Sequence, residues 1–223
     1  MLTARGTERK TYRAEAFSDA VLAVAITLPV VELRAPKPVP GQSLAQQYAA
    51  LGPDYATYGL TFLVIGIYWG YSHFSGKLWE KTDHVFNLLT LLFLACVSVT
   101  PFPTRPLVEH FNDPANVHTA ALVYAAGLTA PSVAWTLRWL YGVRRGLLGE
   151  HIAPDYVRAV TVKYVASMAL CLTGLAVTAF VSWRVGLAIV GLVTLQFLLP
   201  PMAPRYKPGE EPESEVQEAD ERM

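Results

Sequence analysis

The apolar residues of this 223-residue chain are gathered into blocks long enough to cross a lipid bilayer, and short polar segments separate the blocks. Apolar residues make up 52% of the sequence and charged residues 16%, well below the roughly 25% of a soluble domain. A helix needs about 20 mainly apolar residues to cross the hydrocarbon layer. The pattern therefore predicts an all-α membrane protein.

Six such blocks predict six transmembrane helices, at about residues 13–33, 54–74, 85–100, 117–141, 156–181 and 185–199. The third of these is expected to stop at Pro101, and Pro131 is expected to kink the fourth. Between the first two, residues 43–51 can form a short surface helix with Ser43 as its N-terminal cap.

Lysine and arginine are unevenly divided between the two sides of the predicted bundle, and this asymmetry sets the orientation of a membrane protein. One side, which includes both termini, holds thirteen of them up to Lys207, and the other holds Arg34, Lys37, Arg105 and Arg184. We therefore expect a multi-pass cell-membrane protein with both termini in the cytoplasm. The expected parts are a cytoplasmic N-terminus (1–12), a six-helix transmembrane domain (13–201) and a solvated acidic tail (202–223).

The first predicted helix is too short in apolar sequence to face lipid along its whole length. Its apolar core, residues 20–31, spans about 18 Å at 1.5 Å per residue, whereas the hydrocarbon layer is about 30 Å thick. Its polar N-terminal turns should therefore be covered by protein or water, inside a bundle.

An apolar stripe runs along this helix. At about 100° per residue, Val24, Leu28 and Val31 share one side with a single hydroxyl, that of Thr27, while Asp19 points away from them. The stripe has two interpretations. It can be an ordinary packing surface, or it can line a pore in which apolar rings gate by dewetting and Thr27 lends oxygens to a passing cation.

Asp19 needs a partner, because a carboxylate at the centre of a membrane helix costs roughly 2.5–3.5 kcal/mol. Arg13 lies six residues earlier, on a different face. The second helix offers Trp69-x-x-x-His73 on one face near the same membrane surface. We expect Ser18, Asp19 and His73 to meet, with Trp69 beside them, either as a static clasp or as a proton relay. A relay would suit a proton-coupled secondary transporter using Asp19 and His73.

Enzymatic chemistry has no support in the sequence. The zinc-protease, serine-hydrolase and phosphate-loop motifs are all missing. Cys96 and Cys171 fall inside predicted apolar helices without the spacing of metal ligands. We therefore expect no enzyme activity, no cofactor, no resident metal ion and no nucleic-acid partner.

The run Arg13-x-x-x-Phe17-Ser18-Asp19, with the apolar stretch that follows it, resembles the first-helix signature of the lysosomal potassium channel family and its prokaryotic homologues. The Trp69-x-x-x-His73 pair, Asn87 and the Pro101-Phe-Pro-Thr sequence also resemble that family. The resemblance covers most of residues 13–201.

This resemblance implies a homotetramer of six-helix subunits, in which four first helices line a central pore that prefers potassium. Its partners would be further copies of itself, the lipid bilayer and monovalent cations, with permeant K⁺ in place of any cofactor. The implied constriction consists of Val24, Leu28 and Val31, with a threonine layer at Thr27 where K⁺ can bind transiently. The implied structural network, which holds helices together, consists of Arg13, Phe17, Ser18, Asp19, Trp69 and His73.

Two features of the first helix depart from the family pattern. Val24 and Val31 are shorter than the isoleucine or leucine usual there, which predicts a wider constriction or weaker filtering. Pro29 stands where leucine is common, and it predicts either a hinge for pore opening or a fixed bend. The leading expectation is a potassium-preferring channel; the transporter and a non-conducting scaffold are the alternatives.

Overall fold

The structure is a computed structural model that describes residues 11–209, so most of the predicted N-terminal segment and of the acidic tail lies outside the described residues. The described residues form helices and no β-sheet. Its elements are α1 (Tyr12–Thr27), the 3₁₀ helix η2 (Leu28–Glu32), α2 (Leu44–Ala50), α3 (Gly52–Gly76), α4 (His84–Ser98), α5 (Pro101–Glu109), α6 (Val117–Arg145), α7 (Pro154–Phe180), α8 (Trp183–Leu195) and the 3₁₀ helix η3 (Gln196–Leu198).

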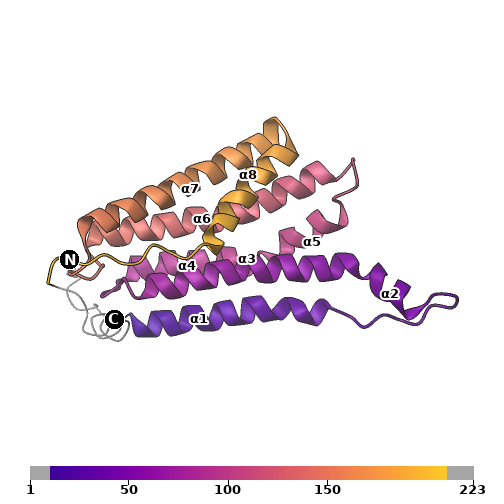
Figure 1. The fold of residues 1–223 in the computed structure, drawn as a ribbon, viewed down its shortest axis with the longest axis horizontal. Helices are drawn as coiled ribbons and strands as arrows, with labels where there is room; N and C mark the ends of the chain where they lie inside the picture. Colours follow the sequence, from indigo (N-terminus) through magenta and orange to yellow (C-terminus); the bar gives the residue numbers. More distant parts are fainter. Residues whose placement is uncertain (1–10, 210–223) are drawn as a thin grey trace, which may run out of the picture.

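The long helices run side by side in an elongated bundle (Figure 1). α1 lies at one edge and packs against α3 and α4, while α6 packs against α4, α7 and α8. α2 lies at the end of the bundle opposite the start of α1 (Figure 1). Its predicted cap is confirmed: the Ser43 hydroxyl accepts a hydrogen bond from the Gln46 amide at 3.3 Å, and the Gln46 side chain accepts one from the Ser43 amide at 2.8 Å.

Helices occupy all six predicted regions, but they differ in how well they fit a bilayer. Within the described residues, four helical stretches are long and apolar enough to span it: Tyr12–Glu32, His84–Glu109, Val117–Arg145 and Pro154–Phe180. The remaining two regions are α3, which falls outside that set, and the shorter apolar stretch Trp183–Leu198. Six spans therefore stay a prediction.

The third predicted helix does end before Pro101, but a helix that was not predicted follows it. α4 ends at Ser98, but α5 begins at Pro101 and continues to Glu109. Pro101 and Pro103 fall in the first turn of α5, where the missing N–H would have no intrahelical acceptor anyway. The Thr104 hydroxyl donates to the carbonyl oxygen of Thr100 at 2.7 Å, which satisfies a backbone group at the junction.

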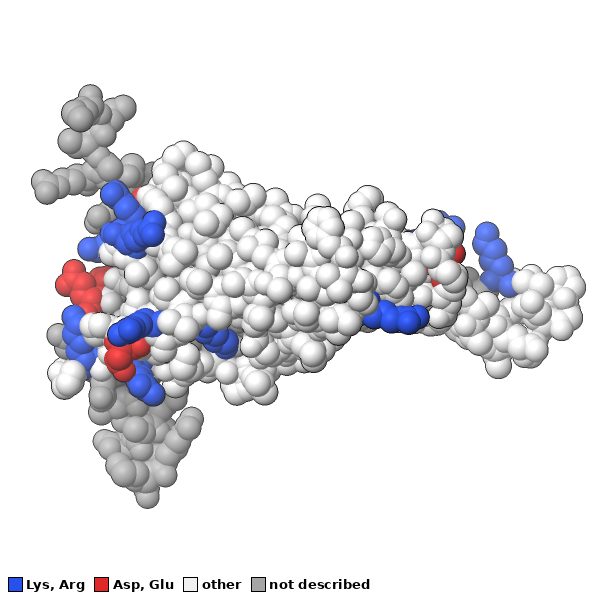
Figure 2. Space-filling view, turned by 90° about the horizontal axis from the view of Figure 1, so that it is seen from above, with Lys and Arg blue, Asp and Glu red and all other residues white. Residues whose placement is uncertain are grey.

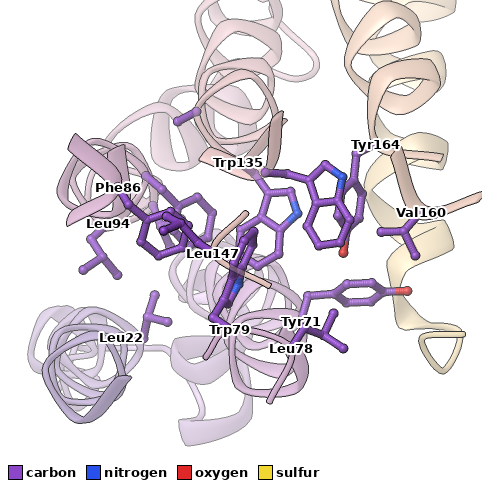
Figure 3. Packing of buried hydrophobic residues seen from close by; sticks show 14 of the residues in the cluster. Leu22, Tyr71, Leu78, Trp79, Phe86, Leu94, Trp135, Leu147, Val160 and Tyr164 are labelled. Carbon is purple, nitrogen blue, oxygen red and sulfur yellow. The ribbon is translucent and has the colours of Figure 1, made fainter. Parts of the chain in front are cut away.

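Aromatic side chains fill the core on the side of the bundle where α3 ends (Figure 3). Trp79, from the segment after α3, has its ring 4.7 Å from that of Phe86 and 5.4 Å from that of Trp139. Its indole N–H donates to the Ser75 hydroxyl at 3.0 Å. The Trp79 ring lies against Gly142 of α6, where any larger residue would meet it. This core ties the short α3–α4 connection to α6.

Charged side chains gather towards the two ends of the face shown in Figure 2, and a band without them lies between. Such a distribution is typical of a protein whose middle is surrounded by hydrocarbon, because a charge there must be paired or hydrated. It agrees with the apolar helices that run along the same direction.

α7 and α8 approach each other closely through glycines. A side chain at Gly186 of α8 would collide with Thr178 and with the backbone carbonyl oxygen of Gly174, both in α7. In lipid, where burial of apolar surface gives little drive for helix association, small residues that let backbones approach are a main source of packing energy.

We expect Gly186→Ala to destabilise the protein by about 1–3 kcal/mol, because two of the obstructing atoms, the Thr178 nitrogen and the Gly174 carbonyl oxygen, belong to the backbone of α7 and cannot turn aside. Thermal unfolding in detergent measures the effect. Gly191→Ala is the matched control, since it lies in the same helix with open space around it. Equal stability of the two variants would contradict the close contact.

Candidate functional site

One face of α1 and η2 is covered by no other part of the described chain. Val24 is 55% exposed, Leu28 58% and Val31 75%. With Ser98 and Pro101 at the α4–α5 junction, these side chains line an open groove of about 590 Å³. The predicted stripe therefore forms a continuous apolar surface at the edge of the bundle.

The opposite face of α1 makes the packing contacts. Ser18, Leu22 and Ala25 are buried, and Pro29 continues this line into η2. These positions recur every three or four residues, as on one side of a helix. The buried face of α1 thus makes the packing contacts within the described chain. Any contacts of the exposed stripe lie outside it.

Pro29 lies where the helix type changes. The Leu28 amide still donates to the Val24 carbonyl, so the α-helical pattern reaches Leu28, and residues 28–32 then form the 3₁₀ helix η2. Proline cannot donate the bond that would continue the α-helix. In a 3₁₀ helix, side chains three residues apart eclipse each other, so Val31 lies above Leu28.

Thr27 lies on the exposed side of α1, in its last turn. Its hydroxyl donates to the carbonyl oxygens of Ala23 at 2.8 Å and Val24 at 3.1 Å. Because a hydroxyl has one proton and two lone pairs, these bonds use the proton and leave the oxygen able to accept from water or to face a cation.

A polar cavity of about 210 Å³ lies behind α1, between α1, α3, α4 and α6. Ser18, Asp19 and His73 all line it, so the structure brings these predicted residues to one site. Within residues 11–209, no hydrogen bond or ion pair joins Asp19 to His73, and the Ser18 hydroxyl donates to the Ala14 carbonyl oxygen at 2.8 Å. The cavity is large enough for several waters, which can connect the polar groups.

Trp69 and His73 stack on the outer side of α3. Their ring centroids are 5.7 Å apart with planes inclined by 25°, which follows from their spacing of four residues. His73 reaches the cavity, whereas Trp69 is 47% exposed and does not line it.

Arg13 and Phe17, the first two residues of the signature, lie on the surface of α1. Phe17 is 52% exposed. Both line a shallow pocket of about 280 Å³ together with Thr82 and Asn87 of the α3–α4 region. The structure thus places the signature in two neighbouring pockets, one on each side of α1's first turns.

Arg138 is a site residue that was not predicted from the sequence, where it is one of the thirteen charges that orient the chain. The side chain is buried in α6 and lines the polar cavity. Its guanidinium carbon is 4.8 Å from the ring centroid of Phe86, 4.9 Å from Trp135 and 5.7 Å from Trp79. Its Nε has no hydrogen-bond partner in the described chain. An arginine three residues after a tryptophan, inside an apolar run, was the available signal.

We expect Arg138→Lys to lower the stability by about 1–2 kcal/mol, because an ammonium cannot stack flat against several rings as a guanidinium does. Thermal unfolding in detergent measures it. Arg144→Lys is the control, an exposed arginine in the last turn of the same helix. If both variants unfold at the wild-type temperature, the ring contacts contribute nothing to stability.

Comparison with known proteins places this geometry in a family. Residues 13–101 match the model described as endosomal/lysosomal potassium channel TMEM175. A potassium channel of Streptomyces collinus is 35% identical over 188 residues, which cover 83% of this chain and 90% of that protein. A potassium channel of Chamaesiphon minutus is 31% identical over 195 residues, covering 86% and 95%.

Two solved structures share the fold. The crystal structure of a lysosomal potassium-selective channel TMEM175 homolog from Chamaesiphon minutus aligns with a TM-score of 0.68 at 30% identity, covering 85% of this chain and 96% of that one. The crystal structure of the potassium channel MtTMEM175 aligns with a TM-score of 0.59, covering 88% and 91%. The second likeness, at 18% identity, is one of fold alone.

Proposed function

The chain belongs to the TMEM175 family of potassium channels, a multi-pass membrane family and not one of enzymes, and on this premise we propose that it forms a homotetrameric, potassium-preferring cation channel of the cell membrane. In this proposal α1 and η2 of each subunit line a central pore. The observation that carries it is the uncovered apolar face of α1.

In a tetramer, this exposed face of α1 would line the pore. Val24, Leu28 and Val31 are all more than half exposed, whereas the opposite face of α1 packs against the bundle. Four copies around an axis would bring these side chains into apolar rings. Such rings obstruct water and ions at a narrow radius and gate conduction by dewetting.

Thr27 supplies the one hydroxyl on this face. Its oxygen can still accept, since its proton is held by backbone carbonyls. Four such oxygens would give a partly dehydrated K⁺ a weak and transient site without a resident metal ion or cofactor. Weak binding is what conduction requires, because the ion must also leave.

The arrangement of the helices supports six spans with both termini on one side. α3 and the stretch from α8 to η3 would complete the set of the four long apolar helices. The start of α1 and the last described residues lie at the same end of the bundle (Figure 1), as an even number of spans requires. The excess of lysine and arginine on that side supports a cytoplasmic location for both termini.

We assign the polar cavity a structural role. Ser18, Asp19 and His73 surround a space that water can fill, and Arg138 brings a positive charge to the same space. In this role a hydrated cavity satisfies these groups where α1 packs against α3 and α4. The proton-coupled transporter is not favoured, because the matched family and relatives are channels.

Purified protein in potassium-loaded liposomes should pass K⁺ down its gradient, and a bi-ionic reversal potential should show a preference for K⁺ over Na⁺. Empty liposomes and protein-containing liposomes without a gradient are the controls. Vesicles that stay tight to both cations would reject the channel.

We expect Leu28→Asn to raise cation flux, because an amide in the constriction lets water occupy it and removes the dewetting barrier. Flux and reversal potential are measured as for the wild type. Leu192→Asn is the matched control: Leu192 is 68% exposed, on α8, away from the proposed pore. If both variants change the flux equally, or if neither changes it, the stripe takes no part in conduction.

A further inference from the structure

Arg105 of α5 faces three carboxylates from three different segments. Its Nη1 donates to Glu32 at 3.1 Å, its Nε donates to Glu109 at 2.7 Å, and its Nη2 lies 3.6 Å from a carboxylate oxygen of Asp54. Each nitrogen of the guanidinium therefore has its own carboxylate. Only arginine offers this planar fork, since lysine presents a single compact charge.

The connection to Glu32 is important because Glu32 ends η2, one residue after Val31. η2 is weakly held otherwise: within the described chain, Pro29 is its only buried residue. After Leu33 the backbone has no regular structure until α2. Arg105 thus connects the outer end of the α1–η2 segment to α3 and α5.

Glu32 also lines the groove that contains Val24, Leu28 and Val31. Leu28, Val31 and Glu32 all belong to the five-residue helix η2, so its backbone geometry fixes their relative positions. A shift of Glu32 would therefore carry Val31 and Leu28 with it and change how far they project.

We propose that Arg105 is a positioning residue for conduction: by tying Glu32 to Asp54 and Glu109, it sets the place of η2 and the width of the constriction at Leu28 and Val31. This inference rests on the proposed channel function. The alternative is a purely electrostatic role, in which the charges of Arg105 and the three carboxylates change the local concentration of permeant cations.

Single substitutions separate the two roles by the direction of their effects. Glu32→Gln removes a negative charge and Arg105→Gln removes a positive one, but both break the tether. Positioning predicts that both shift the K⁺/Na⁺ permeability ratio in the same direction, by about twofold, as expected for the loss of an exposed ion pair. It also predicts that the double variant shifts the ratio no more than Arg105→Gln alone.

Arg105→Lys sharpens the comparison, because it keeps the charge and loses the fork. Positioning predicts that it resembles Arg105→Gln. Arg34→Gln is the matched control, an exposed cation two residues beyond Glu32 that makes no ion pair in the described chain. Two outcomes would overturn the proposal. In the first, Glu32→Gln and Arg105→Gln shift the permeability ratio in opposite directions and Arg105→Lys behaves as the wild type. In the second, all variants keep the wild-type ratio.

Hydrogen exchange tests the tether independently of conduction. The Leu33 amide donates to the Val30 carbonyl oxygen at 3.1 Å, and this bond reports on η2. Its exchange should accelerate in Glu32→Gln and Arg105→Gln, but not in Arg34→Gln, while α7 exchanges as in the wild type. Unchanged exchange at Leu33 would reject the tether; a wild type that does not conduct would instead reject the channel.

Discussion

An ionisable side chain on a membrane helix needs a partner or water, and α1 meets this requirement by turning Glu15 and Asp19 towards a cavity inside the bundle. Arg138 provides the opposite charge in the same cavity, and three aromatic rings hold its guanidinium. Because water can fill this cavity around its polar turns, the short apolar core of α1 does not have to span the whole hydrocarbon layer. The same contacts fix which side of α1 faces the bundle.

With its polar side facing the bundle, α1 has an opposite side that is apolar and uncovered. Leu22 and Ala25 pack inwards, whereas Val24 and Leu28 remain more than half exposed. A groove lined by such side chains at the edge of a folded bundle supports the proposal that further copies of the chain complete the pore. Neither this geometry nor the family membership by itself gives the number of copies.

Much of the fold could be predicted, because hydropathy along the chain reports directly on helices in a membrane. The cap at Ser43 and the shared helix face of Trp69 and His73 are local patterns, and the sequence shows them directly. Arg138 and Arg105 were missed as structural residues because most of their partners, such as Phe86 for Arg138 and Glu32 for Arg105, are distant in sequence. α5 was missed because a proline is read as a stop, although Pro101 at the first position starts a helix.

The change of helix type at Pro29 alters the proposed constriction in a way that no count at 100° per residue could foresee. Such a count separates Val31 from Leu28 by about 60° around the axis. In η2 the two side chains eclipse, so they follow one line along the proposed pore instead of turning away from it. Two apolar layers would then stack in register above Thr27. Because a valine reaches less far than a leucine, the narrower of these layers would be the one at Leu28, next to the hydroxyl that can receive the ion.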